Sequence, residues 1–247
     1  MTEQRREQRH WERLAQSDPM WVILPEPGKR GAWNEADFFD SGVREISAAL
    51  SLLRERLGLV PRSGRALDFG CGLGRLTQAL AERFDHVDGV DISATMIENA
   101  SQRNRHGARV AYHVNATDRL SMIPDGTMDL VYSRITLQHI PRQAMKRYIA
   151  EFARVLSPGG VAMFQVLTRA RSWSVRLRHR VRDALPRMYR WARDLVTRRA
   201  RWEMNSISED EVRQVVQTTG GRVIAVLEDE RNGVFDSRWI IVTKPTD

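Results

Sequence analysis

Three glycines and one aspartate lie close together in the run Asp68-Phe69-Gly70-Cys71-Gly72-Leu73-Gly74. Glycine allows the backbone to turn tightly and allows a ligand to approach it closely. The apolar run 66–69 predicts a buried strand and residues 73–83 predict a helix, so the loop leads from a strand into a helix N-terminus. Free N–H groups and the positive end of the helix dipole suit a carboxylate or a phosphate. The loop therefore predicts a ligand-binding turn.

The spacing of these residues departs from the dinucleotide-binding fingerprint. That fingerprint requires a glycine three residues after its second glycine, and here the position is Arg75. The pattern is instead acid-x-Gly-x-Gly-x-Gly, with Asp68 inside it. A second acid, Asp91, follows the predicted strand 86–90, where a carboxylate can accept hydrogen bonds from two neighbouring ribose hydroxyls.

The glycine run resembles the first motif of the class I S-adenosylmethionine (SAM)-dependent methyltransferases. The resemblance covers about residues 64–167 and includes the runs 124–133, 137–140 and 156–160 around the fourth and fifth predicted strands. It implies SAM as the cofactor, with Asp68 positioning the methionine amino group and Asp91 holding the ribose. Ile92 and Met96 are placed to pack on the adenine.

The third predicted strand departs from the family pattern. Family members carry a Gly-Asp-Ala type triplet there, whose acid faces the adenine amine, whereas this chain has Asn115-Ala116-Thr117. The role is left open between a backbone contact at Ala116 and the side chain of Asp118. The complete set predicted to bind the cofactor is Asp68, Gly70, Cys71, Gly72, Gly74, Asp91, Ile92, Met96, Asn115, Ala116, Thr117, Ser133, Arg134 and Gln138. We expect Cys71 to be a small loop residue and not a reactive thiol.

His139 is the predicted catalytic residue. It lies just beyond the fourth strand, at the edge of such sheets where ligands bind. A hydroxyl acceptor must lose a proton to attack a methyl group, and an imidazole is a suitable general base near neutral pH. The alternative is that His139 shapes the loop or positions the substrate. Arg134 and Gln138 lie on the same edge, where they could contact cofactor or substrate.

Residues 1–62 predict an N-terminal helical cap, which is interrupted by the loop 25–28 and whose last helix ends near Gly58. Its aromatic residues could wall an acceptor pocket or pack the cap onto a sheet; they are Trp11, Trp21, Trp33, Phe38 and Phe39. Arg44 could reach the SAM carboxylate from this cap.

Residues 63–247 predict one methyltransferase domain. Further strands are predicted at 110–114, 130–132, 161–167, 223–227 and 239–242, with helices at 94–105, 141–156 and 208–219. Alternating strands and helices indicate an α/β doubly wound sheet. We expect seven mostly parallel strands in the order 3-2-1-4-5-7-6, with the last two antiparallel around Asn232-Gly233.

The length of 247 residues corresponds to one or two domains, and the composition is that of a soluble globular protein. A single cysteine excludes a disulfide framework and a cysteine-cluster metal site, and we expect no metal. With no signal core and no apolar run of membrane-spanning length, the expected location is the cytoplasm.

The net charge of +8 comes from one segment. Residues 169–201 contain twelve arginines and two acids, within a predicted helical insert at 169–205 that carries an apolar stripe. Three interpretations remain open: a lid with solvated arginines, recognition of an anionic acceptor or an anionic membrane surface, or contact with nucleic-acid phosphates. The aromatic residues lie on the apolar stripe and not among the arginines, which disfavours nucleic acid.

The resulting prediction is SAM-dependent transfer of a methyl group to an oxygen or nitrogen of a small molecule, anionic or linked to a sugar or lipid. The alternatives are an RNA methyltransferase and a SAM-binding partner or regulatory protein without turnover.

Overall fold

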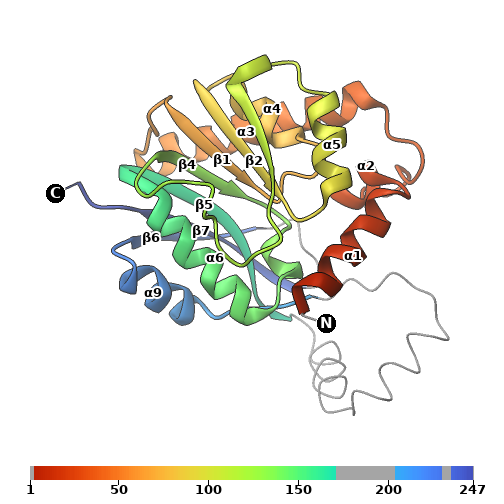
Figure 1. The fold of residues 1–247 in the computed structure, drawn as a ribbon. Helices are drawn as coiled ribbons and strands as arrows, with labels where there is room; N and C mark the ends of the chain where they lie inside the picture. The colour runs from red at the N-terminus through yellow and green to blue at the C-terminus, as the bar shows by residue number, and fades with distance from the viewer. Residues whose placement is uncertain (1–2, 171–203, 230–234, 247) are drawn as a thin grey trace, which may run out of the picture.

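The computed structural model describes residues 3–170, 204–229 and 235–246. Its centre is a seven-stranded sheet in the order β3-β2-β1-β4-β5-β7-β6 (Figure 1). The strands are β1 (Arg65–Phe69), β2 (His86–Asp91), β3 (Val110–Val114), β4 (Met128–Ser133), β5 (Leu156–Ala170), β6 (Arg222–Glu228) and β7 (Phe235–Thr243). β1 to β5 are parallel to one another, and β7 is antiparallel to both β5 and β6. The predicted fold class and strand order are confirmed.

Helices cover both faces of the sheet (Figure 1). They are α1 (Glu3–Ala15), α2 (Pro19–Ile23), α3 (Glu35–Leu57), α4 (Arg75–Ala81), α5 (Ala94–Gln102), α6 (Arg142–Val155) and α9 (Glu209–Thr218), with short 3-10 turns η1 (Gly107–Arg109) and η2 (Leu137–His139). Side chains alternate across β1, so Leu67 and Phe69 face α6 while Ala66 faces α3 and α4.

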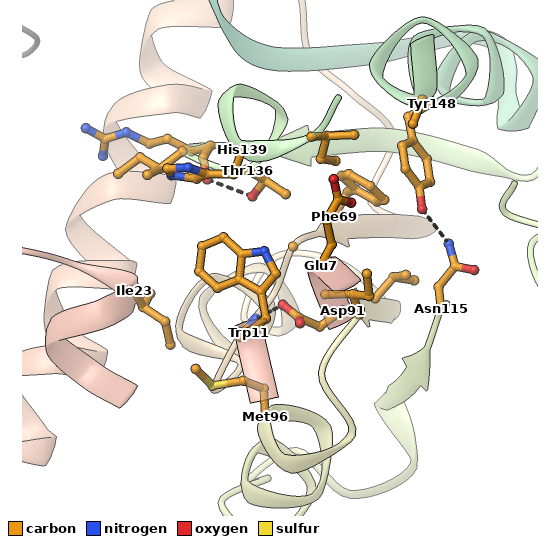
Figure 2. A pocket seen from close by; sticks show the side chains of 18 of the residues that line it. Glu7, Trp11, Ile23, Phe69, Asp91, Met96, Asn115, Thr136, His139 and Tyr148 are labelled. Carbon is orange, nitrogen blue, oxygen red and sulfur yellow. Dashed lines mark hydrogen bonds between the residues drawn. The ribbon is translucent and has the colours of Figure 1, made fainter. Parts of the chain in front are cut away.

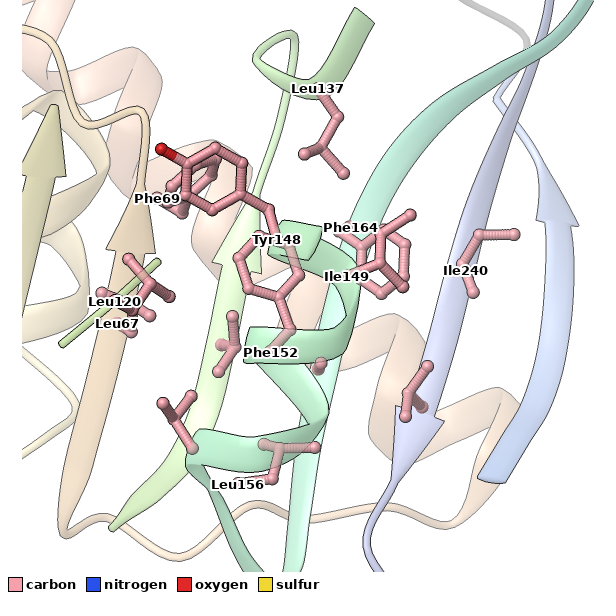
Figure 3. Close-up of a cluster of buried hydrophobic side chains, with 14 of the residues drawn as sticks. Leu67, Phe69, Leu120, Leu137, Tyr148, Ile149, Phe152, Leu156, Phe164 and Ile240 are labelled. Atoms are coloured by element: carbon pink, nitrogen blue, oxygen red, sulfur yellow. The ribbon is translucent and has the colours of Figure 1, made fainter. Parts of the chain in front are cut away.

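The largest core lies between the sheet and α6 with α9 (Figure 3). Tyr148, Ile149 and Phe152 project from one face of α6 onto the central strands, because their spacing of one, three and four residues matches the helical period. Phe69 and Phe152 pack edge to face with ring centroids 5.1 Å apart. This core packs against one face of β1 and β4 and so fixes the position of these two strands.

The ends of several helices follow sequence signals. Ser93 caps α5 by accepting a hydrogen bond from the Met96 N–H, and Ser208 forms a complete capping box with Glu211. Gly58 ends α3 in the left-handed conformation. The fifth strand begins at Leu156, earlier than predicted, because Leu156 already pairs with Met128 of β4. Within this early part of the strand, Gly159 has a φ of 75°.

Two predicted features lie outside the described residues. They are the turn at Asn232-Gly233 and positions 171–203 of the arginine-rich helical insert predicted at 169–205; the first two positions of that insert, Arg169 and Ala170, belong to strand β5 and not to a helix. α3, the last helix of the predicted cap, shares a hydrophobic core with the sheet. Within the described residues no helix is both long and apolar enough to cross a membrane.

Candidate functional site

A pocket opens where the carboxyl ends of β1, β2 and β4 meet the N-terminal helices (Figure 2). Loops at the carboxyl edge of such a sheet are the usual ligand position, because the strand order reverses there. Residues predicted as site residues and found in the lining are Gly70, Gly72, Asp91, Ile92, Met96, Asn115, Thr117, Arg134 and His139. The predicted residues Asp68, Cys71, Gly74, Ala116, Ser133 and Gln138 do not line it.

The glycine loop forms one wall. Gly70 and Gly72 have φ values of 81° and 53°, a region that favours glycine. The N–H groups of Gly70 and Cys71 both donate to the Val90 carbonyl, at 2.8 and 3.1 Å, which fastens the loop to β2. A side chain at Gly74 would meet the Tyr112 hydroxyl at 2.1 Å, so Gly74 allows Tyr112 to pack closely; its predicted contact with the cofactor stays a prediction.

Asp91 lies at the end of β2, where the sequence placed it. Its Oδ2 accepts from the Gly72 N–H and its Oδ1 from the Ser93 N–H, both at 2.9 Å. Burial raises the pKa of this carboxyl, and the backbone N–H groups partly oppose the rise. A carboxylate has about four lone-pair positions, so each oxygen keeps capacity for another donor. The side chain points toward the pocket (Figure 2).

Asp68 lies behind the glycine loop. It is 1% exposed, and its Oδ2 accepts a hydrogen bond of 2.6 Å from the Thr77 hydroxyl on α4. Burial raises the pKa of Asp68 to about 7. Its predicted contact with a methionine amino group stays a prediction, since the side chain does not reach the described pocket lining.

The wall after β3 is built around Asn115. Its amide donates to the Tyr148 hydroxyl at 3.2 Å, and its Oδ1 accepts from the backbone and the side chain of Thr117. Asp118 pairs with Arg147 and does not line the pocket. Neither alternative for the adenine contact, Ala116 or Asp118, lies in the lining; Asn115 and Thr117 do.

The loop after β4 forms the opposite wall. The hydroxyl of Ser133 donates to the Phe69 carbonyl at 2.9 Å and so joins β4 to β1; its predicted contact with the cofactor stays a prediction. Gln138 Nε2 lies 3.2 Å from His139 Nε2. The imidazole of His139 faces the indole of Trp11 edge to face, with centroids 5.3 Å apart. His139 therefore lies in the pocket between the loop and α1.

Arg134 links this wall to a buried group of charges. Its guanidinium and that of Arg75 both pair with Glu45 of α3, and the Tyr132 hydroxyl donates to the same carboxylate at 3.1 Å. Burial alone would raise the pKa of Glu45, but the charges of Arg75 and Arg134 lower it. Arg44, the arginine suggested by the sequence, is exposed and does not line the pocket.

Helix α1 roofs the pocket. Glu7 and Trp11 point into it from one face of the helix (Figure 2). Glu12 accepts hydrogen bonds from the N–H groups of Ala94 and Thr95, at 2.6 and 3.3 Å, and so joins α1 to the N-terminus of α5. Of the five aromatic residues predicted in the cap, only Trp11 lines this pocket; Phe38 and Phe39 are buried in an adjoining core that shares Val22 with the pocket lining.

Several lining residues were not predicted. They are Glu7, Val22, Ile23, Phe69, Val90, Ile135, Thr136, Ile140, Ala144 and Tyr148. Glu7 could have been found from its helical spacing of four to Trp11. Tyr148 carries no local signal, because its partner Asn115 is 33 residues away.

Comparison with known proteins bears on this region. Residues 66–160 match a family described as "Methyltransferase domain". The ubiquinone biosynthesis O-methyltransferase of Methylococcus capsulatus is 34% identical over 107 residues, which is 43% of this chain and 44% of that protein. Residues 66–160 are therefore similar in sequence to known methyltransferase domains.

Two further known proteins are similar to this chain. Phosphoethanolamine N-methyltransferase 1 of Arabidopsis thaliana is 36% identical over 108 residues, 43% of this chain and 21% of that protein. The solved structure of magnesium protoporphyrin IX methyltransferase from Synechocystis PCC 6803, with bound SAH, aligns with a TM-score of 0.63 at 16% identity, covering 96% of this chain and 97% of that one. The chain spans less than half the length of the curated relatives it matches, and the structural likeness shows a shared fold.

Proposed function

We propose that this protein binds S-adenosylmethionine and transfers its methyl group to an oxygen or nitrogen of a small-molecule acceptor. The observation that carries the proposal is the position of Asp91. Its carboxylate ends β2, borders the glycine loop and faces a pocket inside a methyltransferase domain. The names of the similar proteins include one O-methyltransferase and one N-methyltransferase, which supports both classes of acceptor atom.

The polar and apolar side chains of the pocket fit a nucleoside that carries an amino acid. Asp91 would accept from the ribose hydroxyls, and Ile92 and Met96 supply apolar surface for the adenine. Asn115 and Thr117 border the same end. Arg134 brings a cation to the pocket wall, and its buried Nε has no hydrogen-bond partner among the described residues, which suits a carboxylate. Bound SAM supplies a methyl group on a sulfonium, ready for in-line transfer.

The chain's own part in the reaction is then placement and exclusion of water. α1 and α2 line the pocket with Trp11, Val22 and Ile23, whose apolar side chains would exclude water from bound reactants. We expect residues 1–62 to act as this cap and residues 63–247 to form the transferase domain.

His139 is the proposed general base for a hydroxyl acceptor. An amide nitrogen only donates hydrogen bonds, so the tautomer of His139 that fits the contact with Gln138 Nε2 carries its proton on Nδ1 and has a lone pair on Nε2. Nε2 can take a proton from the acceptor when the acceptor hydroxyl replaces the Gln138 amide. For an amine acceptor, His139 has only to orient the neutral amine.

Titration calorimetry with SAM tests the cofactor site. Asp91→Ala should weaken SAM binding by about 2 kcal/mol or more, because the ribose hydroxyls lose their charged partner. Asp85→Ala is the matched control, since Asp85 is exposed just before β2. Equal SAM affinity in the wild type and Asp91→Ala would contradict the proposed site.

A second measurement separates enzyme from binder. Incubation of the protein with methyl-labelled SAM and cell extract, followed by mass spectrometry of small molecules and RNA, should label a small molecule by one methyl group. Label in RNA would favour the alternative nucleic-acid substrate. SAM binding without label in any fraction would favour a non-catalytic SAM-binding protein.

A further inference from the structure

Ile135 has an unusual backbone conformation at the wall of the pocket. Its φ is 59°, and among the described residues it is the only non-glycine residue with a positive φ. A side chain branched at Cβ strongly disfavours this left-handed region. Ile135 lines the pocket, as do its neighbours Arg134 and Thr136. Strained residues of this kind persist only where surrounding contacts hold them.

Gln165 of β5 supplies the contact that holds Ile135. The Oε1 of Gln165 accepts a hydrogen bond of 2.9 Å from the Ile135 N–H. The other end of the amide donates to Asp229 at 2.6 Å and to the Ser237 hydroxyl at 2.7 Å. Gln165, Asp229 and Ser237 are 5%, 4% and 0% exposed. The network therefore runs from the β6–β7 edge of the sheet to the pocket through one buried side chain.

The orientation of the Gln165 amide is determined by its partners. A backbone N–H can only donate, so it must face the amide oxygen of Gln165. The Asp229 carboxylate lies on the opposite side of the amide, where it accepts from the nitrogen. If the amide were reversed, its oxygen would face the Asp229 carboxylate and its NH₂ group would face the Ile135 N–H, and both contacts would be repulsive. Gln165 is thus held in one orientation, and the Ile135 N–H has one fixed acceptor.

The turn at Ile135 positions groups on both sides of it. Arg134 turns back toward Glu45. Thr136 packs against the glycine loop so closely that a Cβ added at Gly70 would lie 2.1 Å from its hydroxyl oxygen. The Thr136 carbonyl then accepts from the His139 N–H at 3.0 Å.

The same loop has a second attachment to the C-terminal part of the chain. The Asn205 N–H donates to the Gln138 carbonyl at 2.7 Å, next to His139. The loop 134–139 is therefore held at Ile135 and at Gln138 by residues 30 and 67 positions further along the chain. A local sequence motif alone does not determine its shape.

We propose that Gln165, supported by Asp229 and Ser237, is a positioning residue that holds Ile135 in the left-handed conformation and so sets Arg134 and Thr136 for cofactor binding. The inference rests on the proposed SAM site. Gln165 does not line the pocket and acts through Ile135. Its hydrogen bond compensates the conformational cost at Ile135, and without it the turn relaxes and moves the pocket wall.

A double-mutant cycle tests this coupling. Gln165→Met has a similar length and no hydrogen-bonding amide, and we expect it to weaken SAM binding about tenfold, the equivalent of the cost of one left-handed residue. Ile135→Gly removes the conformational cost, because glycine adopts positive φ readily. In the Ile135→Gly background, Gln165→Met should change the SAM dissociation constant by less than about twofold.

Gln214→Met on the exposed face of α9 is the matched control and should leave SAM binding unchanged. A tenfold loss in both backgrounds, or no loss in either, would overturn the proposal, because both results show that Gln165 and Ile135 act independently. If the wild type binds no SAM, the proposed function fails and this inference fails with it. If the wild type and Gln165→Met bind SAM equally well, only the inference fails.

Ser237→Ala is the second variant, for the case in which Gln165→Met does not fold. It removes one of the two acceptors of the Gln165 amide and leaves the Asp229 carboxylate in place. We expect about threefold weaker SAM binding, about half the free-energy change expected of Gln165→Met, which Ile135→Gly should again relieve. An unchanged dissociation constant in Ser237→Ala would count against the network.

Discussion

The indole of Trp11 meets the imidazole of His139 edge to face, with ring centroids 5.3 Å and planes 68° apart. Trp11 belongs to the first helix, and His139 follows the fourth strand, so the contact spans the pocket from the roof to the wall. Edge-to-face pairs contribute about 0.5–1.5 kcal/mol beyond the area they bury. The contact therefore helps to keep α1 over the pocket.

Replacing Trp11 should open the roof. Trp11→Ala is expected to increase the rate of SAM dissociation about fivefold, because the ring contact and much of the buried area are lost. Stopped-flow displacement of bound SAM measures this rate. Trp11→Phe keeps an aromatic ring and should remain near the wild-type rate. Equal rates in wild type and Trp11→Ala would show that α1 does not limit release.

His139→Phe separates packing from proton transfer. Phenylalanine keeps a ring against Trp11 and lacks both ring nitrogens, so SAM affinity should stay within about twofold of the wild type. Turnover of a hydroxyl acceptor should fall about 100-fold if His139 removes its proton. The pH dependence of turnover should also lose its lower ionisation. A variant with wild-type turnover and an unchanged pH profile would assign His139 a structural role.

Asp68 should make stability depend on pH. Its pKa is raised from 3.8 to about 7 by burial, so folding favours the protonated carboxyl. This contribution is fully present below about pH 4 and is lost as the pH rises through 7. The Asp68→Asn variant is uncharged at every pH, so it does not lose this stability as the pH rises. The difference in the free energy of unfolding between this variant and the wild type should therefore increase between pH 4 and 7 and then level off.

Urea denaturation of both proteins at pH 5 and pH 8 measures that difference. Asp85→Asn provides the comparison, because Asp85 is exposed and should give the same difference from the wild type at both pH values. A constant difference between Asp68→Asn and the wild type across this range would mean that Asp68 is ionised in the folded protein at pH 5.

Glu45 should be important for stability. Glu45→Gln leaves the buried guanidinium groups of Arg75 and Arg134 without their shared counter-charge. Loss of one partner from a buried pair costs about 3–5 kcal/mol, so the urea midpoint should fall strongly. Glu55→Gln removes an exposed partner of Arg54 and should change stability by less than about 1 kcal/mol. Similar midpoints for the two variants would contradict the buried-charge interpretation.

Much of this protein was predictable from the sequence because the signals are local. Strand and helix positions follow the apolar periodicity, caps such as Ser93 and Ser208 need only neighbouring backbone, and the glycine loop must follow a strand. Asp91 was also found in this way, because the end of the second strand has one position in a doubly wound sheet.

The tertiary structure decided which of these residues face the pocket. Asp68 and Gly74 belong to the glycine motif, but Asp68 accepts a hydrogen bond from α4 and Gly74 packs against Tyr112 of β3. Tyr148 and Glu7, in contrast, line the pocket from helices that are distant in the sequence. The left-handed Ile135 has no sequence signal of its own, because its conformation is held by Gln165, 30 residues further along the chain. Contacts between residues far apart in the chain depend on how strands and helices pack, and no local pattern records them.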